Sequence, residues 1–230
     1  MNSSFLEIAN AYWLREFRDT SGLHCVRPEN PTYEIFAQNQ FDFLKFIHYN
    51  IVTGGHIFAG FYTERERKTG IVPSIFLDID VAEREAPESI WENLQLAFLP
   101  IFFSNTEVYF SGSKGFHFRI YISPTQFELL RKEREKMYLV FSAWVQHYVD
   151  KSTFLSLKRL YRVPLTVHPK TQLWKIPVTK DLKWNEIKQI ANSPYSYVTY
   201  LEEQFARPIK PIDVNIFTKN PVDLVTQTTL

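Results

Sequence analysis

Two aspartates separated by one residue end an apolar stretch of the chain, FLDID at residues 76–80. If this stretch is a strand, its period of two places Asp78 and Asp80 on one face, with their backbones roughly 6–7 Å apart. Carboxylates that close repel each other unless a cation lies between them, and hard divalent metals prefer such oxygen ligands. The pair therefore indicates a metal site, while a strand that runs into an acidic loop has the same pattern.

A short turn with two glycines, SGSKG at residues 111–115, connects two further apolar segments. Glycine lets backbone N–H groups approach a phosphate closely, and the turn adds two hydroxyls and an ammonium group. Histidine and arginine side chains then share one face of the following predicted strand. The pattern predicts an anion site, and an ordinary β-hairpin with a solvated strand is the alternative. The candidate residues are Ser111, Ser113, Lys114, His117 and Arg119.

A third segment, which begins at Asp150 and ends with RVPLTVHPKT at residues 162–171, is rich in cationic and imidazole groups. Charge on this scale can neutralise a triphosphate or a nucleic-acid backbone. It is also compatible with one solvated edge of the domain. The groups concerned are Lys158, Arg159, Arg162, His168 and Lys170.

Composition limits the kinds of site that the chain can build. With a net charge of +1 over 230 residues, binding to nucleic acid would need a local basic patch. The single cysteine, Cys25, excludes an intramolecular disulfide and a multi-cysteine zinc site, and the six histidines have no metal-finger spacing. We therefore expect no structural zinc. Without an apolar run of 18 residues or a signal peptide, the sequence favours an intracellular protein that does not enter a membrane.

The elements that must position these residues alternate between helices and strands. This order predicts a mixed α/β (α+β) domain over residues 1–206, followed by a tail at 207–230 that is a candidate for binding a partner. Residues 64–70 are interpreted as a charged loop. Helices are expected over 3–18, 41–49, 87–99, 124–149, 182–191 and 196–204, and strands or extended segments over 33–36, 56–63, 73–80, 106–111, 116–122 and 160–178.

Two helix starts follow from residues that favour helix N-termini. Asn39 is predicted to cap the helix at 41–49, whose inward residues would include Phe41. Ser123 and Pro124 are predicted to open the long helix at 124–149, in the N-cap and N1 positions.

Taken together, the order of the three segments resembles the catalytic small subunit of archaeo-eukaryotic DNA primases. FLDID is similar to the first motif of that family and SGSKGFH to the second. VD at 149–150 with RVPLTVHPKT is similar to the third, including the spacing of eighteen between Asp150 and His168. Weaker likeness extends upstream to LREF at 14–17, so the resemblance covers roughly residues 10–178.

The resemblance implies a two-lobed primase catalytic core with an RRM-like palm, which makes short primers on a DNA template from nucleoside triphosphates. It implies that two Mg²⁺ or Mn²⁺ ions are bound by Asp78, Asp80 and Asp150. The incoming triphosphate would be bound by Ser111, His117, Arg162 and His168. Ser113, Lys114 and Lys170 are further candidates for the nucleotide, and Arg15, Arg119 and Arg159 for contacts to phosphate or template.

The expected partners are single-stranded DNA, nucleoside triphosphates and a primase large subunit or another replication protein. The chain departs from the family in lacking the Cys/His zinc module of cellular members, and Gln172 replaces the glycine that usually follows Lys-Thr. It therefore resembles a minimal form, cytoplasmic in an archaeal, plasmid or viral system.

Three alternatives remain on sequence grounds. SGSKGFH is also similar to the polymerase domain of bacterial end-joining ligases, whose third motif differs, so a repair polymerase is the second enzyme hypothesis. A non-catalytic nucleic-acid-binding replication subunit with the same fold is another. An unrelated metal-dependent phosphodiesterase would leave the cationic segment at residues 162–170 unexplained.

Overall fold

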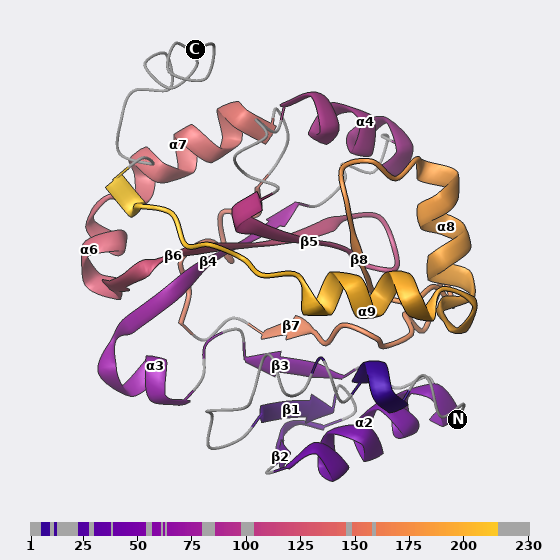
Figure 1. Ribbon diagram of the computed structural model, residues 1–230. Helices are drawn as coiled ribbons and strands as arrows, with labels where there is room; N and C mark the ends of the chain where they lie inside the picture. Colours follow the sequence, from indigo (N-terminus) through magenta and orange to yellow (C-terminus); the bar gives the residue numbers. More distant parts are fainter. Residues whose placement is uncertain are drawn as a thin grey trace.

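The computed structural model describes residues 6–9, 12, 23–27, 30–37, 39–53, 57–60, 62, 64–79, 86–97, 104–145, 149–157 and 160–215. Two four-stranded sheets with helices around them form its framework (Figure 1). Every pairing between the named strands is antiparallel, so the fold class is α+β.

The smaller sheet combines the N-terminal part of the chain with one strand from much later in the sequence. Its strands are β1 (Leu23–Arg27), β2 (Asn30–Ala37), β3 (Phe58–Gly60) and β7 (Leu160–Arg162), in the order β2-β1-β3-β7. Helix α2 (Gln40–Thr53) packs against β2 on the outer side of this sheet (Figure 1). The position of β7 places the cationic segment next to the strands β1, β2 and β3 and helix α2, which together form the N-terminal lobe.

The larger sheet carries the first two candidate motifs on neighbouring strands. It consists of β4 (Ile71–Ile79), β5 (Thr106–Phe110), β6 (Phe116–Gln126) and β8 (Ile176–Val178), in the order β4-β6-β5-β8. Beside it lie α3 (Glu64–Thr69), α4 (Pro87–Ala97), α6 (Phe127–Lys132), α7 (Arg134–Val145), α8 (Trp184–Asn192), the short 3₁₀ helix η1 (Pro194–Ser196) and α9 (Val198–Ala206). In Figure 1, α4 and α7 cover one side of this sheet and α9 runs along β8.

The predicted start of the long helix at Ser123-Pro124 is wrong. Strand β6 continues to Gln126, because Thr125 and Gln126 pair with Val72 and Ile71 of β4. Pro124 lies where the register of this pairing shifts, and a bulge tolerates a residue that has no N–H to donate. The helical part begins at residue 127 and is divided into α6 and α7 at residue 133. The residues interpreted as a charged loop form α3.

The N-terminus of α2 confirms one capping prediction and corrects a burial prediction. The side-chain Oδ1 of Asn39 accepts hydrogen bonds from the backbone N–H groups of Phe41 (3.0 Å) and Asp42 (3.1 Å). Phe41 is nevertheless 67% exposed, and the helix instead buries Phe43, Phe46, Ile47 and Asn50. The burial of Phe41 is mispredicted because apolar residues occur on more than one face of this helix. Which face is buried depends on how the helix packs against β2.

The end of the described chain lies against the larger sheet. The backbone N–H of Ile212 donates to the carbonyl of Tyr121, and that of Ser123 donates to the carbonyl of Ile212, both at 3.0 Å. The first part of the predicted tail, up to residue 215, is therefore bound to β6, and residues 216–230 lie outside the described part. None of the helices in the described ranges is long and apolar enough to cross a membrane.

A buried amide connects the N-terminal lobe to the third motif. Asn50 of α2 is fully buried, and its Nδ2 donates to the carbonyl of Val167 at 3.1 Å. The backbone N–H of Val167 donates to Oδ1 of Asn50 at 2.7 Å. The side chain thus pairs with both backbone groups of the residue that precedes His168, so α2 helps to fix the position of that histidine.

Asn50→Leu is expected to lower the free energy of unfolding by about 2–4 kcal/mol, because both backbone groups of Val167 lose their partners in a buried site. Urea denaturation followed by circular dichroism measures this change. Asn39→Ala removes an exposed cap from the same helix and should cost only about 1 kcal/mol. Equal losses in the two variants would contradict the proposed difference in burial.

Candidate functional site

A cavity of about 330 Å³ lies where the two sheets meet, and all three candidate motifs reach it. Phe58 comes from β3, and Leu160, Tyr161 and Arg162 come from β7. The other described lining residues come from β4, the turn at 111–115, β6 and, in the case of His168, the segment after β7. The structure therefore collects side chains that are far apart in the sequence. The sequence-predicted residues among them are Asp78, Ser111, Ser113, Lys114, His117, Arg162 and His168.

Pairing between β4 and β6 brings the first and second motifs together. Asp78 lies directly opposite His117 in this pairing, and the Nε2 atom of His117 is 3.5 Å from Oδ1 of Asp78. Asp78 is only 5% exposed although it lines the cavity. Since a carboxylate loses hydration in such a position, it needs a cationic or hydrogen-bonding neighbour.

Asp150 lies next to Asp78, along the edge of β4 that does not pair with β6. Val149 forms an isolated antiparallel bridge with Ile79, and the backbone N–H of Asp150 donates to the carbonyl of Asp78 at 2.8 Å. Residues opposite each other in an antiparallel pair project their side chains to the same face, with Cβ atoms roughly 4.5–5.5 Å apart. The third-motif aspartate and the first-motif aspartate therefore share a face, despite the long stretch of chain between them.

This pair of aspartates fits part of a divalent metal site. Carboxylate oxygens on one face are the ligands that Mg²⁺ and Mn²⁺ prefer. Oδ1 of Asp150 accepts hydrogen bonds from the backbone N–H (2.8 Å) and hydroxyl (2.7 Å) of Ser152, which fix its orientation. The predicted third ligand, Asp80, lies outside the described residues. Within the described ranges, no group of three or more His, Cys, Asp or Glu side chains has metal-binding geometry.

The turn at 111–115 is held closed by Ser111. Its backbone N–H donates to the carbonyl of Gly115 (2.9 Å), and its hydroxyl oxygen accepts from the backbone N–H groups of Gly115 (3.2 Å) and Ser113 (3.4 Å). Gly112 has a φ of +80°, and a Cβ there would lie 2.7 Å from the carbonyl oxygen of Leu173. The turn therefore requires glycine at 112, and its hydroxyl and amide groups are arranged tightly at the cavity wall.

Arg162 brings a buried guanidinium group to the cavity. It is 8% exposed, and within the described part of the chain its Nε and Nη1 atoms are buried without a hydrogen-bond partner. Loss of hydration lowers the pKa of the guanidinium to about 10, and the nearby Asp78 opposes this shift. Arg162 thus remains charged at neutral pH, and an anion in the cavity would supply the missing partner.

The backbone fixes the tautomer of His168. Its Nδ1 atom accepts hydrogen bonds from the backbone N–H groups of Lys170 (3.2 Å) and Thr171 (3.4 Å). A neutral imidazole therefore carries its proton on Nε2, and the ring lines the cavity as a hydrogen-bond donor. Lys170 is exposed on the same turn and does not belong to the described cavity lining.

The remaining predicted contacts are placed differently. Arg119 lies two residues beyond His117, where its Nε donates to Oγ of Ser74 (3.3 Å) and its guanidinium carbon lies 5.0 Å from the ring centroid of Tyr121. It is not among the described residues that line the cavity of about 330 Å³. Arg15 and Arg159 lie outside the described residues. Contacts from these three arginines to phosphate or template remain predictions.

Sequence reasoning missed Lys175, which is 1% exposed and donates from Nζ to the carbonyl of Arg162 at 2.6 Å. It also missed Phe58 and Tyr161 in the cavity lining. The available signal was a single lysine inside the apolar run LWKIPV at 173–178, because lysine is almost never fully buried unless it is paired.

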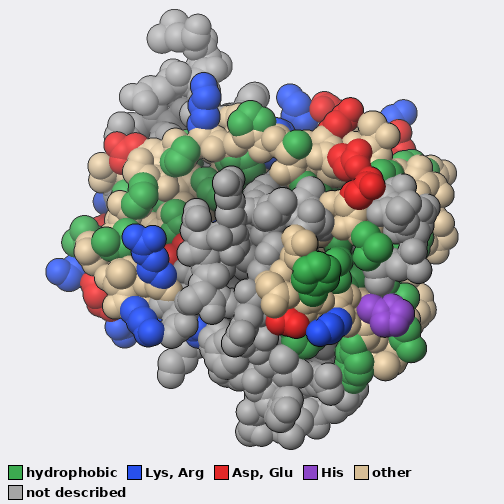
Figure 2. Space-filling model, turned by 60° about the horizontal axis from the view of Figure 1, so that its bottom comes forward, with side chains coloured by type: hydrophobic (Ala, Val, Ile, Leu, Met, Phe, Trp, Pro, Cys, Tyr) green, Lys and Arg blue, Asp and Glu red, His purple; other side chains and the backbone are tan. Residues whose placement is uncertain are grey.

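Charge on one face of the molecule is mixed rather than concentrated. On the face shown in Figure 2, the Lys and Arg side chains of the described residues lie among Asp and Glu side chains. This distribution agrees with the net charge of +1. In contrast, Lys114, Arg162 and two histidines line one cavity together with Asp78, so that cationic and imidazole groups are concentrated there.

Gln172 occupies the position at which the motif that the sequence resembles usually has glycine. Its φ is +60°, a left-handed conformation that costs a residue with a side chain about 1 kcal/mol. Gln172→Gly is therefore expected to change the free energy of unfolding by less than about 1 kcal/mol, since glycine relieves the strain but gains freedom in the unfolded chain. Gln172→Val should be clearly destabilising, because β-branched residues avoid this conformation. Thermal unfolding of the two variants measures the difference, and equal melting temperatures would contradict it.

Comparisons with known proteins identify likenesses among solved structures alone. No protein-family profile matches the chain, and no curated protein matches it. The AEP domain of the cyanophage S-2L primase-polymerase is similar with 14% identity and a TM-score of 0.49, over 81% of this chain and 94% of that chain. The polymerase domain of Mycobacterium tuberculosis ligase D, solved in complex with DNA, has 12% identity and a TM-score of 0.47, over 88% and 92%. Likenesses at this level concern the course of the backbone.

Proposed function

We propose that this chain is a template-directed nucleotidyltransferase of the primase-polymerase superfamily. In this proposal it is the catalytic subunit of a DNA primase, or a primase-polymerase, that makes short primers on single-stranded DNA. The observation that carries the proposal is the buried Arg162 guanidinium, which lacks hydrogen-bond partners at Nε and Nη1 among the described residues, in a cavity that also contains Asp78 and two histidines. Such a cavity attracts a polyphosphate and presents it beside a pair of carboxylates.

Each part of the cavity has a role in binding the incoming nucleoside triphosphate. Arg162 offsets the phosphate charge in a site where few water molecules screen it. His117 and His168 donate Nε2–H hydrogen bonds to phosphate oxygens, and the hydroxyl of Ser111 can donate another. Lys114, which is exposed at the cavity, provides an additional cation. Together these donors hold the α-phosphorus in a fixed position for attack.

The reaction is an in-line displacement at the α-phosphorus. The 3′-oxygen of the growing strand forms the new P–O bond, the bond to pyrophosphate breaks, and the hydroxyl proton passes to solvent water. Asp78 and Asp150, with Asp80, would hold divalent cations. Such cations would lower the pKa of the 3′-hydroxyl and offset the charge of the leaving pyrophosphate. The protein groups orient the triphosphate and exclude water from the buried carboxylate.

The alternatives differ in what they require of the carboxylates. A non-catalytic nucleic-acid-binding subunit gains nothing from two aspartates on one face beside a phosphate site, because such groups repel DNA. A repair polymerase would use the same residues but would need an annealed primer. The two enzyme hypotheses therefore share one site and separate in their substrates.

The test is incubation of the protein with single-stranded DNA, labelled nucleotides and Mg²⁺ or Mn²⁺, with and without an annealed primer. Synthesis without a primer is the result expected of a primase. Synthesis with a primer alone would favour the repair-polymerase alternative. A folded protein that incorporates no nucleotide under either condition would contradict nucleotidyl transfer.

A further inference from the structure

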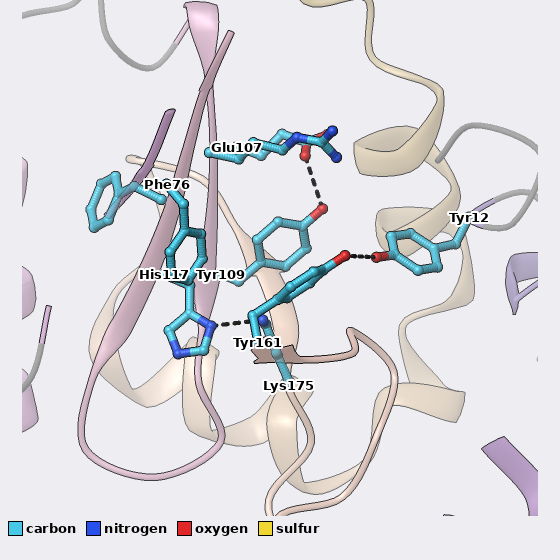
Figure 3. Close-up of a pocket in the computed structure, with 9 residues that line it drawn as sticks. Tyr12, Phe76, Glu107, Tyr109, His117, Tyr161 and Lys175 are labelled. Carbon is cyan, nitrogen blue, oxygen red and sulfur yellow. Dashed lines mark hydrogen bonds between the residues drawn. The ribbon is translucent and has the colours of Figure 1, made fainter. Parts of the chain in front are cut away.

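A fully buried lysine lies directly behind the two motif residues His117 and Arg162. Figure 3 shows Lys175 with its ammonium next to the His117 ring and below the ring of Tyr161. Nζ of Lys175 is 2.7 Å from Nδ1 of His117 and 2.6 Å from the carbonyl oxygen of Arg162. The centroids of the Tyr161 and Tyr109 rings lie 4.7 Å and 5.3 Å from it.

The neighbours of the Lys175 Nζ atom are groups that can interact with an ammonium. A carbonyl oxygen and an imidazole nitrogen accept hydrogen bonds from an ammonium, and the faces of two tyrosine rings attract a cation. Glu107, which lines the same small internal space, accepts a hydrogen bond from the hydroxyl of Tyr109 at 3.2 Å, and Arg119 lies opposite Glu107 in the pairing of β5 with β6. A buried ammonium is costly unless it is paired in this way, so its position is closely determined.

The backbone of Lys175 ties this side chain to the third motif. Its N–H donates to the carbonyl of Thr166, and its carbonyl accepts from the N–H of Leu165, both at 2.9 Å. The residue is thus anchored to the segment between Arg162 and His168, while its side chain reaches His117 of the second motif. This arrangement couples the two motifs through one side chain.

We propose that Lys175 is a positioning residue that fixes the orientation and tautomer of His117, so that His117 presents its Nε2–H to the phosphate cavity. An ammonium can donate but not accept, so Nδ1 of His117 must be the acceptor. The proton of the neutral imidazole then lies on Nε2, which is 3.5 Å from Oδ1 of Asp78. This inference rests on the proposed function for its consequence, but not for its geometry.

His168 reaches the same state by a different means. Two backbone N–H groups hold its Nδ1, whereas a lysine side chain holds that of His117. Both rings line the cavity as Nε2–H donors, which suits a ligand that offers acceptor oxygens, such as a polyphosphate. Without the ammonium, the His117 ring can rotate about its χ2 angle and present a C–H group instead.

The first test observes His117 directly, without a nucleotide. Long-range ¹H–¹⁵N spectra of the imidazole rings, at about pH 8, where an ordinary histidine is neutral, are recorded for the wild type and for Lys175→Met. The wild type should show His117 as a single Nε2–H tautomer with a hydrogen-bonded Nδ1. In Lys175→Met the Nδ1 resonance should shift and a second ring state should appear. Ile176→Val, a change at the neighbouring buried residue, should leave the His117 signals in place.

The second test asks whether Lys175 acts through His117. Binding of inorganic tripolyphosphate and of ATP is measured by calorimetry for Lys175→Met, His117→Asn and the double variant. Lys175→Met should weaken binding about tenfold, the loss expected for one charge-assisted hydrogen bond. In the His117→Asn background the same change should cost little more, because the group that it positions is already absent. Equal, additive losses would show a general structural role and overturn the proposal.

Stability and function can be separated in these experiments. If Lys175→Met does not fold, Lys175→Gln keeps an uncharged NH₂ donor group and should shift the Nδ1 resonance of His117 less than the loss of all donors would. A His117 spectrum that is the same as the wild-type spectrum in a folded Lys175 variant overturns the proposal. If the wild type binds neither tripolyphosphate nor ATP, the proposed function fails, and the spectra still decide the role of Lys175.

Discussion

Asp78→Asn is expected to abolish nucleotide incorporation while the fold survives. Asparagine has the same shape and keeps the pairing of β4 with β6, but it removes the charge that the proposed divalent cation would need next to Asp150. Because bound cations contribute several kcal/mol of charge stabilisation to such reactions, the rate should fall on the order of a thousandfold or more. Incorporation of labelled nucleotides on single-stranded or primed DNA measures the change.

The control for Asp78→Asn is Asp181→Asn, which changes an exposed aspartate away from the cavity. It should keep wild-type activity. Circular dichroism and thermal unfolding should show that Asp78→Asn remains folded, because the lost attraction to His117 and Arg162 is offset by the lost repulsion from Asp150. Binding of Mn²⁺, followed by its electron paramagnetic resonance signal, should weaken in the same variant. Retention of more than about a tenth of the activity would rule out Asp78 as a ligand of the catalytic cation.

Arg162→Met is expected to weaken nucleotide binding about ten- to a hundredfold, because a charge-assisted contact to phosphate contributes roughly 1.5–3 kcal/mol. The free energy of unfolding without nucleotide should not fall, since methionine fills the same space without a buried charge. Burial lowers the pKa of Arg162 to about 10, so the folded state bears a cost at neutral pH that is relieved only as the pH rises through that value. A residue that is costly in the free protein and favourable in the complex is characteristic of a binding site.

Lys114→Met is the matched control for Arg162→Met, because it removes an exposed cation from the same cavity. Its loss of nucleotide affinity should be several times smaller, since water screens an exposed charge. If Arg162 instead contacts the DNA backbone, its loss should weaken template binding and reduce the salt dependence by about one phosphate. Nucleotide titrations at fixed template, repeated at two salt concentrations, distinguish the two roles.

Local patterns were sufficient for the elements whose residues specify them directly. The period of two in residues 74–80 predicts a strand, and the structure has strand β4 at Ile71–Ile79. Asn39 is recognisable as a helix cap because its side chain bonds to backbone groups two and three residues away. The glycine at 112 marks a turn, and its φ of +80° is a property of that single backbone position. In these cases the decisive interactions are short in sequence or belong to a single backbone position.

Errors occurred where distant pairing overrode a local preference. Ser123 and Pro124 have the composition of a helix start, but hydrogen bonds from residues 125 and 126 to β4 keep the chain extended. Phe41 has the spacing of an inward residue, yet packing on β2 turns a neighbouring face of α2 inward. The burial of Lys175 depends on a carbonyl, an imidazole and two tyrosine rings from the strands β5, β6 and β7.

The sequence by itself determined which residue types could form a phosphate and metal site and the order in which they occur. Tertiary structure alone decided which of them meet. It places Asp150 opposite Asp78 and brings Arg162 and His168 into the cavity, while Lys170 stays on an exposed turn. The physical reason is that residue spacing encodes which face of an element a side chain occupies. Which groups a side chain on that face meets, and how much of its hydration it loses, depend on how the two sheets pack together.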